Sequence, residues 1–172
     1  MNDFTIKLGS LTNGKNKFSF EIKDQFFEDF TFYELKYADI SAIASIEKYE
    51  EKISLNLAIE GTLNRLSCDI CTEELSVPIS AEINLMIKKT DKDLCSNDEI
   101  LYIKKNESNL ELKHLIFELL VLNIPKKRQH DLDKNQQITC NKKMIDLVNK
   151  YTQTNKQSSD PRWDELKKIK LK

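Results

Sequence analysis

The chain has 172 residues, of which 40% are hydrophobic and 32% charged, with only three glycines and three prolines. This length fits one domain with a tail, and the composition excludes a low-complexity or collagen-like chain. The first 15 residues contain no basic stretch followed by an apolar core, so we expect no secretory signal. A cytoplasmic protein with reduced cysteines is therefore predicted.

The formal net charge of −1 hides an asymmetry between two parts of the chain. Residues 1–122 carry 14 Lys/Arg and 22 Asp/Glu, a balance of −8. Residues 123–172 carry 13 Lys/Arg and 6 Asp/Glu, a balance of +7. A nearly neutral protein of this kind can still bind a polyanion through its basic end. Attraction between the two parts is the alternative explanation of the same pattern.

Alternating apolar residues predict an antiparallel sheet over the first two thirds of the chain. Residues 4–8 and 18–22 alternate on either side of Asn13-Gly14, a pattern that is typical of a hairpin. Further segments alternate in the same way, with polar partners that indicate strands buried on one face: residues 40–49, 53–66, 75–87 and 100–103.

Three short features modify this predicted sheet. Gly61 is expected at a bulge or bend of its strand. Pro78 is expected at a sheet edge or a bulge, because it has no N–H to donate to a neighbouring strand. Asp24 is expected to cap a short helix whose three phenylalanines, between residues 26 and 30, plug one end of the sheet.

The most apolar run in the chain extends from Asn109 to Pro125, and its leucines recur at helical spacing. Asn109 is a plausible N-cap, and Pro125 prevents continuation. The run is too short to span a bilayer, which needs about 20 apolar residues, so no membrane partner is predicted. The predicted fold class is α+β: a curved antiparallel sheet of roughly five to seven strands, which could close into a barrel, with the core helix 110–124 packed on it and C-terminal helices beyond.

The predicted division of the chain is a β-rich body, residues 1–125, and a basic C-terminal extension, residues 126–172. The extension opens with a compact basic loop, residues 126–130, and contains two short helices. One is predicted from Met144 to about Tyr151. The other begins at Asp160-Pro161, where aspartate suits the N-cap and proline the first helical position.

Cys68 and Cys71 are three positions apart between two predicted strands, which is half of the ligand set of a zinc knuckle. A second CxxC is absent, since Cys95 and Cys140 are single. We therefore predict no metal and keep zinc held by Cys68, Cys71, Cys95 and Cys140 as the alternative. A redox dithiol would be expected before a helix N-terminus, whereas predicted strands flank this pair.

The sequence contains no motif of a known catalytic site. It has no Walker loop, GxGxxG, HExxH or nucleophile elbow, and its two histidines offer little material for general acid–base chemistry. We predict that the protein is not an enzyme and has no small-molecule substrate.

The order of the motifs resembles the YceD family of bacterial proteins, in a form like those of Bacteroidetes-type bacteria. The resemblance covers roughly residues 35–172. It rests on four features in sequence order: the CxxC hairpin (Cys68, Cys71), the Leu-rich helix with Glu118 that ends in Leu122-Asn-Ile-Pro125, the basic loop from Lys126 to His130, and Asp160-Pro161-Arg162-Trp163 with its Leu-Lys-Lys helix.

This resemblance implies a small cytosolic factor that is needed for normal levels of 23S rRNA and to which no catalytic activity is attached. In many bacteria the gene of such a protein adjoins one for a large-subunit ribosomal protein. Several relatives carry further cysteines near the C-terminus, which suggests a metal in those members. This chain has only Cys140 there.

The leading hypothesis is that the basic end binds ribosomal RNA or a large-subunit precursor, because lysine and arginine neutralise phosphates and release counterions. Trp163 could stack on an unpaired base. The candidate residues are Lys126, Lys127, Arg128, His130, Lys142, Lys143, Arg162, Trp163, Lys167 and Lys168. Two alternatives stay open: an adaptor whose acidic residues 47–51 and 69–74 recruit a ribosomal protein or a processing enzyme, and a zinc-dependent module.

Overall fold

The computed structural model describes residues 4–30, 35–130 and 139–153. Contacts within the chain divide it into two compact units. The first, the sheet unit, comprises Met1–Ser67 and Glu74–Arg128. The second, the knuckle unit, comprises Cys68–Glu73 and Gln129–Lys172.

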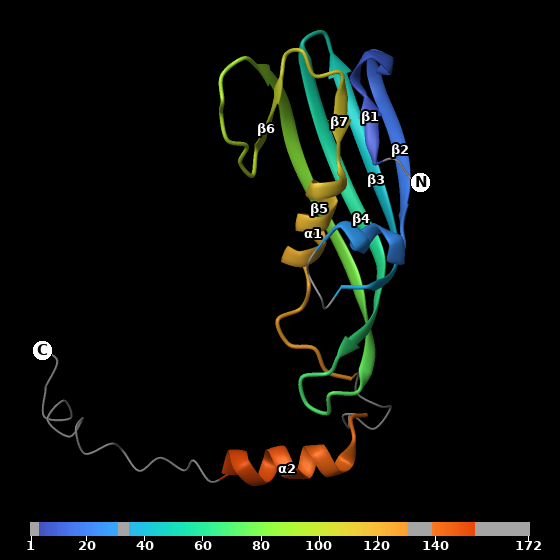
Figure 1. Ribbon diagram of the computed structural model, residues 1–172, viewed down its shortest axis with the longest axis vertical. Coiled ribbons are helices and arrows are strands. Elements are labelled where there is room, and N and C mark those ends of the chain that lie inside the picture. Colours follow the sequence, from blue (N-terminus) through green and yellow to red (C-terminus); the bar gives the residue numbers. More distant parts are fainter. Residues whose placement is uncertain (1–3, 31–34, 131–138, 154–172) are drawn as a thin grey trace, which may run out of the picture. The chain divides into compact units, whose positions relative to one another are not determined.

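Five strands form the main sheet of the sheet unit, in the order β2-β3-β4-β5-β6 (Figure 1). The first four pair antiparallel, as predicted, whereas β6 pairs parallel to β5. The strands are β2 (Gly14–Ile22), β3 (Tyr37–Tyr49), β4 (Lys52–Ser67), β5 (Glu74–Thr90) and β6 (Ile100–Lys104). The fold class is α+β, and the sheet is curved but not closed into a barrel.

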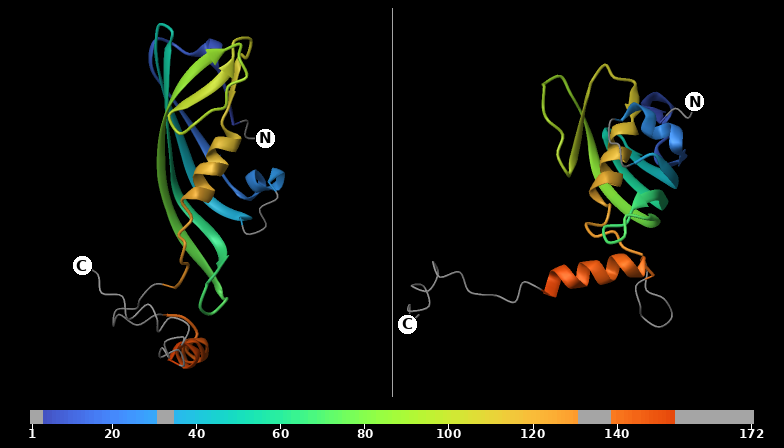
Figure 2. Two further views of the ribbon diagram at one scale, coloured as in Figure 1. Left: turned by 90° about the vertical axis from the view of Figure 1, so that its left-hand side faces the viewer. Right: turned by 60° about the horizontal axis from the view of Figure 1, so that its bottom comes forward.

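The alternation in the sequence separates the two faces of this sheet. On the inner face Ala42 and Ala44 of β3 and Leu57 of β4 are completely buried. The residues between them are exposed or half-buried and face outwards: Ser41, Ile43 and Ser45 of β3, and Asn56 and Ala58 of β4. The core therefore lies on the concave side of the sheet, where Figure 2 shows α1 (Lys113–Leu122).

A second, two-stranded sheet precedes α1 and shortens the predicted helix. β7 (Asn109–Glu111) pairs antiparallel with β1 (Thr5–Lys7). Its central residue Leu110 lies opposite Ile6, and both side chains are buried. The prediction of a helix from residue 110 with Asn109 as its cap was therefore wrong, because pairing with a distant strand outweighs the local helical pattern.

The same pairing overturns the predicted hairpin between residues 4–8 and 18–22. β1 pairs with β7, and β2 pairs with β3, so the two segments do not form a ladder. They still contact through their side chains, since the rings of Phe4 and Phe20 lie 5.6 Å apart. Gly14, at the start of β2, has a φ of 98°, which fits the turn predicted at Asn13-Gly14.

An aromatic cluster fills one side of the core. Residues Asp24–Asp29 form a 3₁₀ helix (η2), in which Phe26 is buried. Phe30, which follows it, stacks on Phe117 of α1 with ring centroids 3.9 Å apart. Asp24 does not cap this helix as predicted. Its carboxylate accepts a hydrogen bond from the backbone N–H of Ala38 instead, at 3.2 Å.

Gly61 occupies a position that only glycine suits well, and Pro78 occupies one that tolerates proline. Gly61 keeps a regular register, so the predicted bulge lies further along, between Leu63 and Leu66. Its φ is +156°, and an added Cβ would lie 2.2 Å from the carbonyl oxygen of Asp39. Pro78 pairs only with β4, because β6 pairs with β5 beyond residue 85. It therefore lies at a local edge, as predicted.

The described part of the knuckle unit contains one helix, α2 (Lys142–Gln153), which confirms the helix predicted near residues 144–151. The second predicted C-terminal helix, from Asp160, lies outside the described residues. Within the described ranges no helix combines the length and the apolar character that crossing a membrane requires.

Candidate metal centre

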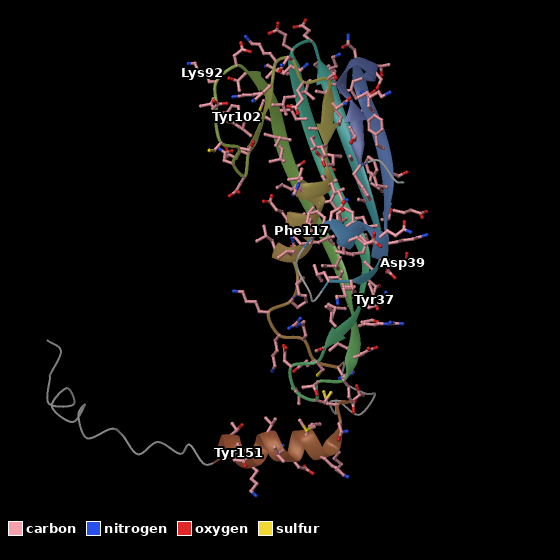
Figure 3. All side chains as sticks on the ribbon, in the orientation of Figure 1. Tyr37, Asp39, Lys92, Tyr102, Phe117 and Tyr151 are labelled. Carbon is pink, nitrogen blue, oxygen red and sulfur yellow. The ribbon has the colours of Figure 1, made fainter. Side chains whose placement is uncertain are left out.

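The turn between β4 and β5 is held closed by its own backbone. The N–H of Cys68 donates to the carbonyl oxygen of Glu73 at 2.9 Å, and the N–H of Thr72 donates to that of Cys68 at 3.0 Å. Thr72, directly after Cys71, has a φ of 61°, a left-handed conformation that a β-branched residue rarely adopts. This strained, tightly bonded turn brings the Cys68 and Cys71 sulfurs to one side, where Figure 3 shows sulfur atoms gathered.

The other part of the site comes from the start of α2. Asn141 is the N-cap, because its side-chain oxygen accepts from the N–H of Lys143 at 3.1 Å. Its side-chain amide donates to the carboxylate of Glu73, also at 3.1 Å. The cap of α2 is thus tied to the cysteine turn, and Cys140, the residue before the cap, is held beside Cys68 and Cys71.

Four ligand atoms meet here, all within 4.8 Å of one another. The sulfurs of Cys68 and Cys140 are 3.5 Å apart. His130 Nδ1 lies 3.5 Å from the Cys71 sulfur and 3.4 Å from the Cys140 sulfur. A tetrahedral zinc ion with its usual bond lengths places two sulfurs about 3.8 Å apart, and a sulfur and a nitrogen about 3.6 Å apart. The separations in the structure are close to those of such a site.

The three thiols are buried, and the pKa values of Cys68 and Cys140 are shifted in opposite directions. Burial by itself raises the pKa of Cys68, and hydrogen bonds to its sulfur oppose that effect. The backbone N–H groups of Cys71 and Ile70, with the thiols of Cys140 and Cys71, bring this pKa down to about 6. Burial raises the pKa of Cys140 to about 11, helped by Cys68 and Cys71 and opposed by a backbone hydrogen bond from His130.

A cation suits this arrangement better than protons do. Buried sulfurs 3.5 Å apart cannot all carry a negative charge unless a positive charge lies between them. Soft thiolate ligands with one imidazole select zinc among the common divalent ions, and a closed four-ligand set is typical of structural zinc. The donor set therefore fits zinc held by the sulfurs of Cys68, Cys71 and Cys140 and by His130 Nδ1.

This group differs in one member from the four cysteines considered from the sequence. Cys95 is exposed in the connection between β5 and β6 and does not belong to it. His130, expected from the sequence among the RNA-binding residues, takes the fourth position. The other half of the ligand set is His130 followed by Cys140 ten positions later, and this pair was not recognised as ligands from the sequence. No spacing rule joins that pair to the CxxC, since the whole second segment of the sheet unit lies between them.

The structure also places some of the predicted basic residues. Lys126 and Lys127 are exposed after α1, and Lys142 and Lys143 are exposed in the first turn of α2. Within the described part of the chain none of these four lysines forms an ion pair. Arg128 is half-buried. The remaining candidates lie outside the described residues: Arg162, Trp163, Lys167 and Lys168.

A comparison with protein-family models identifies the relatives of this chain. The model described as "Large ribosomal RNA subunit accumulation protein YceD" matches residues 55–170, more than half of the chain. The chain belongs to the YceD family. All four ligands of the Cys3His group lie within the matched range of this YceD protein. The family name implies a role in the accumulation of large-subunit ribosomal RNA. No curated protein and no solved structure matches the chain.

Proposed function

We propose that this YceD protein is a non-enzymatic factor in ribosome biogenesis. It supports accumulation of 23S rRNA by binding ribosomal RNA, or a large-subunit precursor, with basic residues placed around a zinc centre. The observation that carries the proposal is the Cys3His group, which joins the β4–β5 turn to the start of α2.

Zinc would give the knuckle unit the stability that its side chains do not supply. In the described part of this unit the only buried side chains are those of the three cysteines. α2 has 12 residues, and isolated helices of about 12–15 residues are marginal in water. A bound zinc ion supplies coordinate bonds from both segments, and such binding is folding free energy.

Basic residues lie beside two of the four ligands in the sequence. Lys126, Lys127 and Arg128 come shortly before His130, while Lys142 and Lys143 come shortly after Cys140. The two latter lysines occupy the first turn of α2, where the helix dipole disfavours cations. A contact with phosphate groups explains why lysine is present where it costs helix stability.

The metal part of the proposal is tested by metal analysis of the purified full chain. We expect close to one zinc ion per chain. Cobalt(II) in place of zinc should show thiolate-to-metal charge-transfer absorption, which requires sulfur ligands. Absence of both signals would show that the Cys3His group does not bind zinc and would contradict the metal part of the proposal.

The RNA part is tested by filter binding of 23S rRNA fragments over a salt series. Lys126→Glu/Lys127→Glu/Arg128→Glu should weaken binding and lower the salt slope by about 3, one for each lost phosphate contact. The matched control, Lys17→Glu/Lys23→Glu/Lys36→Glu, makes the same change in charge in β2 and the segments beside it, and should bind almost as tightly as the unmodified chain. Equal binding by both variants would contradict the proposal.

The adaptor alternative is distinguished from RNA binding by using the protein to capture its partners from cell lysate, with and without nuclease treatment. RNA binding predicts that ribosomal material is lost after nuclease treatment. A ribosomal protein or processing enzyme that stays bound after complete nuclease digestion would favour the adaptor instead.

A further inference from the structure

One end of the sheet unit contains a hollow of about 590 Å³ on the inner face. It lies where β3 turns into β4 and where β5 ends, and Figure 3 labels Lys92 at this end of the sheet. Its floor is apolar and consists of Leu8 in the 3₁₀ turn η1 (Leu8–Ser10), Ile53 and Ile87, all buried. Its rim is charged and consists of Lys48, Glu50, Glu51, Lys88, Lys89 and Lys105.

The lysines of this rim interrupt the apolar alternation of two strands. Along β3 the inner face is apolar up to Ile46, and the next inner position is Lys48. Along β5 it is apolar up to Ile87, and the next inner position is Lys89. Both lysines thus stand where the pattern would otherwise extend the core. The sequence places positive charge at the mouth of an apolar hollow.

The rim is positive although the unit that carries it is not. The sheet unit has 17 Lys/Arg and 20 Asp/Glu, a formal charge of −3, whereas the rim has four lysines and two glutamates. Lys105 pairs with Asp91 at 2.6 Å, and Lys48 donates to the carbonyl oxygen of Leu11 at 3.4 Å. Lys88 and Lys89 are exposed, and the described residues hold no ion pair with either.

The three kinds of lining group match three features of a nucleotide: the face of its base, the amino group of its base and its phosphates. An apolar floor accepts the face of a base, and ammonium groups bind its phosphates. Carboxylates accept hydrogen bonds from exocyclic amino groups, as glutamate does from cytosine N4. Glu50 and Glu51 would repel a bare phosphate ion, so the lining favours a nucleotide with an amino-bearing base over inorganic phosphate.

We propose that this hollow binds one unpaired nucleotide of RNA, with its base against the floor, one phosphate at Lys89 on the inner face, and a neighbouring phosphate of the strand at Lys88, one position earlier and on the other side of β5. The proposal rests on the RNA-binding function proposed above and adds a second contact, at the hollow. A base can enter the hollow only when it is unpaired and unstacked, so single strands should bind and duplexes should not.

The test is fluorescence anisotropy of the full zinc-loaded chain with short single-stranded oligocytidine, oligouridine and a duplex of the same length. Lys88→Glu/Lys89→Glu should weaken binding of oligocytidine about tenfold. The matched control, Lys17→Glu/Lys36→Glu, should bind oligocytidine with an affinity within about twofold of that of the unmodified chain. Glu50→Gln/Glu51→Gln should reduce the preference for cytidine over uridine. All substituted side chains are exposed, and circular dichroism checks that each variant keeps its fold.

The outcomes separate this inference from the proposed function. Loss of binding in Lys126→Glu/Lys127→Glu/Arg128→Glu with no loss in Lys88→Glu/Lys89→Glu would overturn the hollow as a site and leave the basic end in place. Duplex bound as tightly as single strand, with equal dependence on Lys88 and Lys89, would also overturn it. Failure of the unmodified chain to bind any RNA would overturn both.

Discussion

The two units of this protein differ in how much apolar surface their described residues bury. The sheet unit has an extensive apolar core, in which Leu57, Leu63 and Ile116 are completely buried, and each such side chain stabilises the fold by about 1.5–3 kcal/mol. The described part of the knuckle unit buries only three cysteines. Hydrophobic burial can therefore hold the sheet unit together, whereas we propose that the knuckle unit depends on metal ligands.

The largest expected effect is on the knuckle unit. Cys68→Ser/Cys71→Ser replaces two thiolates with hydroxyls that bind zinc poorly, and structural zinc in small domains contributes roughly 10–16 kcal/mol. We expect almost complete loss of bound zinc and of the helical signal of α2, while the sheet signal remains. Metal analysis and circular dichroism measure both. The control is Cys95→Ser, which should retain its zinc, and equal zinc contents in the two variants would contradict the comparison.

The next largest effect is on the sheet unit. Leu57→Ala leaves a cavity in the core and should lower the free energy of unfolding by about 2–5 kcal/mol. Urea denaturation followed by circular dichroism measures this loss. Zinc content should stay at the level of the unmodified chain under native conditions. If the variant lost its metal under those conditions, the two units would not be independently stabilised.

A smaller effect is expected for Gly61→Ala. The added Cβ would lie 2.2 Å from the carbonyl oxygen of Asp39, and the φ of +156° disfavours any side chain. The free energy of unfolding should fall by more than about 1 kcal/mol. Gly9→Ala is the control, because a Cβ added to Gly9 would meet no neighbouring atom within 4 Å. Thermal or urea denaturation that ranked the two variants the other way would refute this account of β4.

The smallest effect is expected at the cap of α2. Asn141→Ala removes the hydrogen bond to the N–H of Lys143 and the link to Glu73, and should destabilise the helix by about 0.5–2 kcal/mol. Hydrogen exchange of the α2 amides measures the loss. Zinc should remain bound, since Asn141 is not a ligand. Asn149→Ala, within the same helix, should change exchange much less.

The sequence predicts those parts of the fold that depend on residues close together along the chain. Alternation locates β3, β4 and β5, because one face of each strand is buried along most of its length. The amphipathic segment after Cys140 locates α2 in the same way. The helical pattern of the leucines, by contrast, wrongly assigns Asn109 to a helix N-cap. Asn109 belongs to β7, which forms by pairing with β1, about 100 residues earlier in the chain.

The metal group could not be predicted for the same physical reason. His130 lies 59 positions from Cys71, and Cys140 lies 72 positions from Cys68. Only the CxxC is a local signal, and it identifies two ligands of the four. The other two are brought there by the fold of the intervening chain. From the sequence, His130 is predicted to bind RNA, and Cys95 stands in the alternative set of zinc ligands where the structure places His130.

We propose that zinc binds Cys140 and His130, which in the sequence lie next to the basic residues that contact RNA. The most direct test measures the affinity of the full chain for 23S rRNA fragments with zinc bound, after removal of zinc by a chelator, and after zinc is restored. The account predicts weaker binding without zinc and recovery when zinc returns, with the sheet signal constant throughout. Equal affinity in all three states would contradict it.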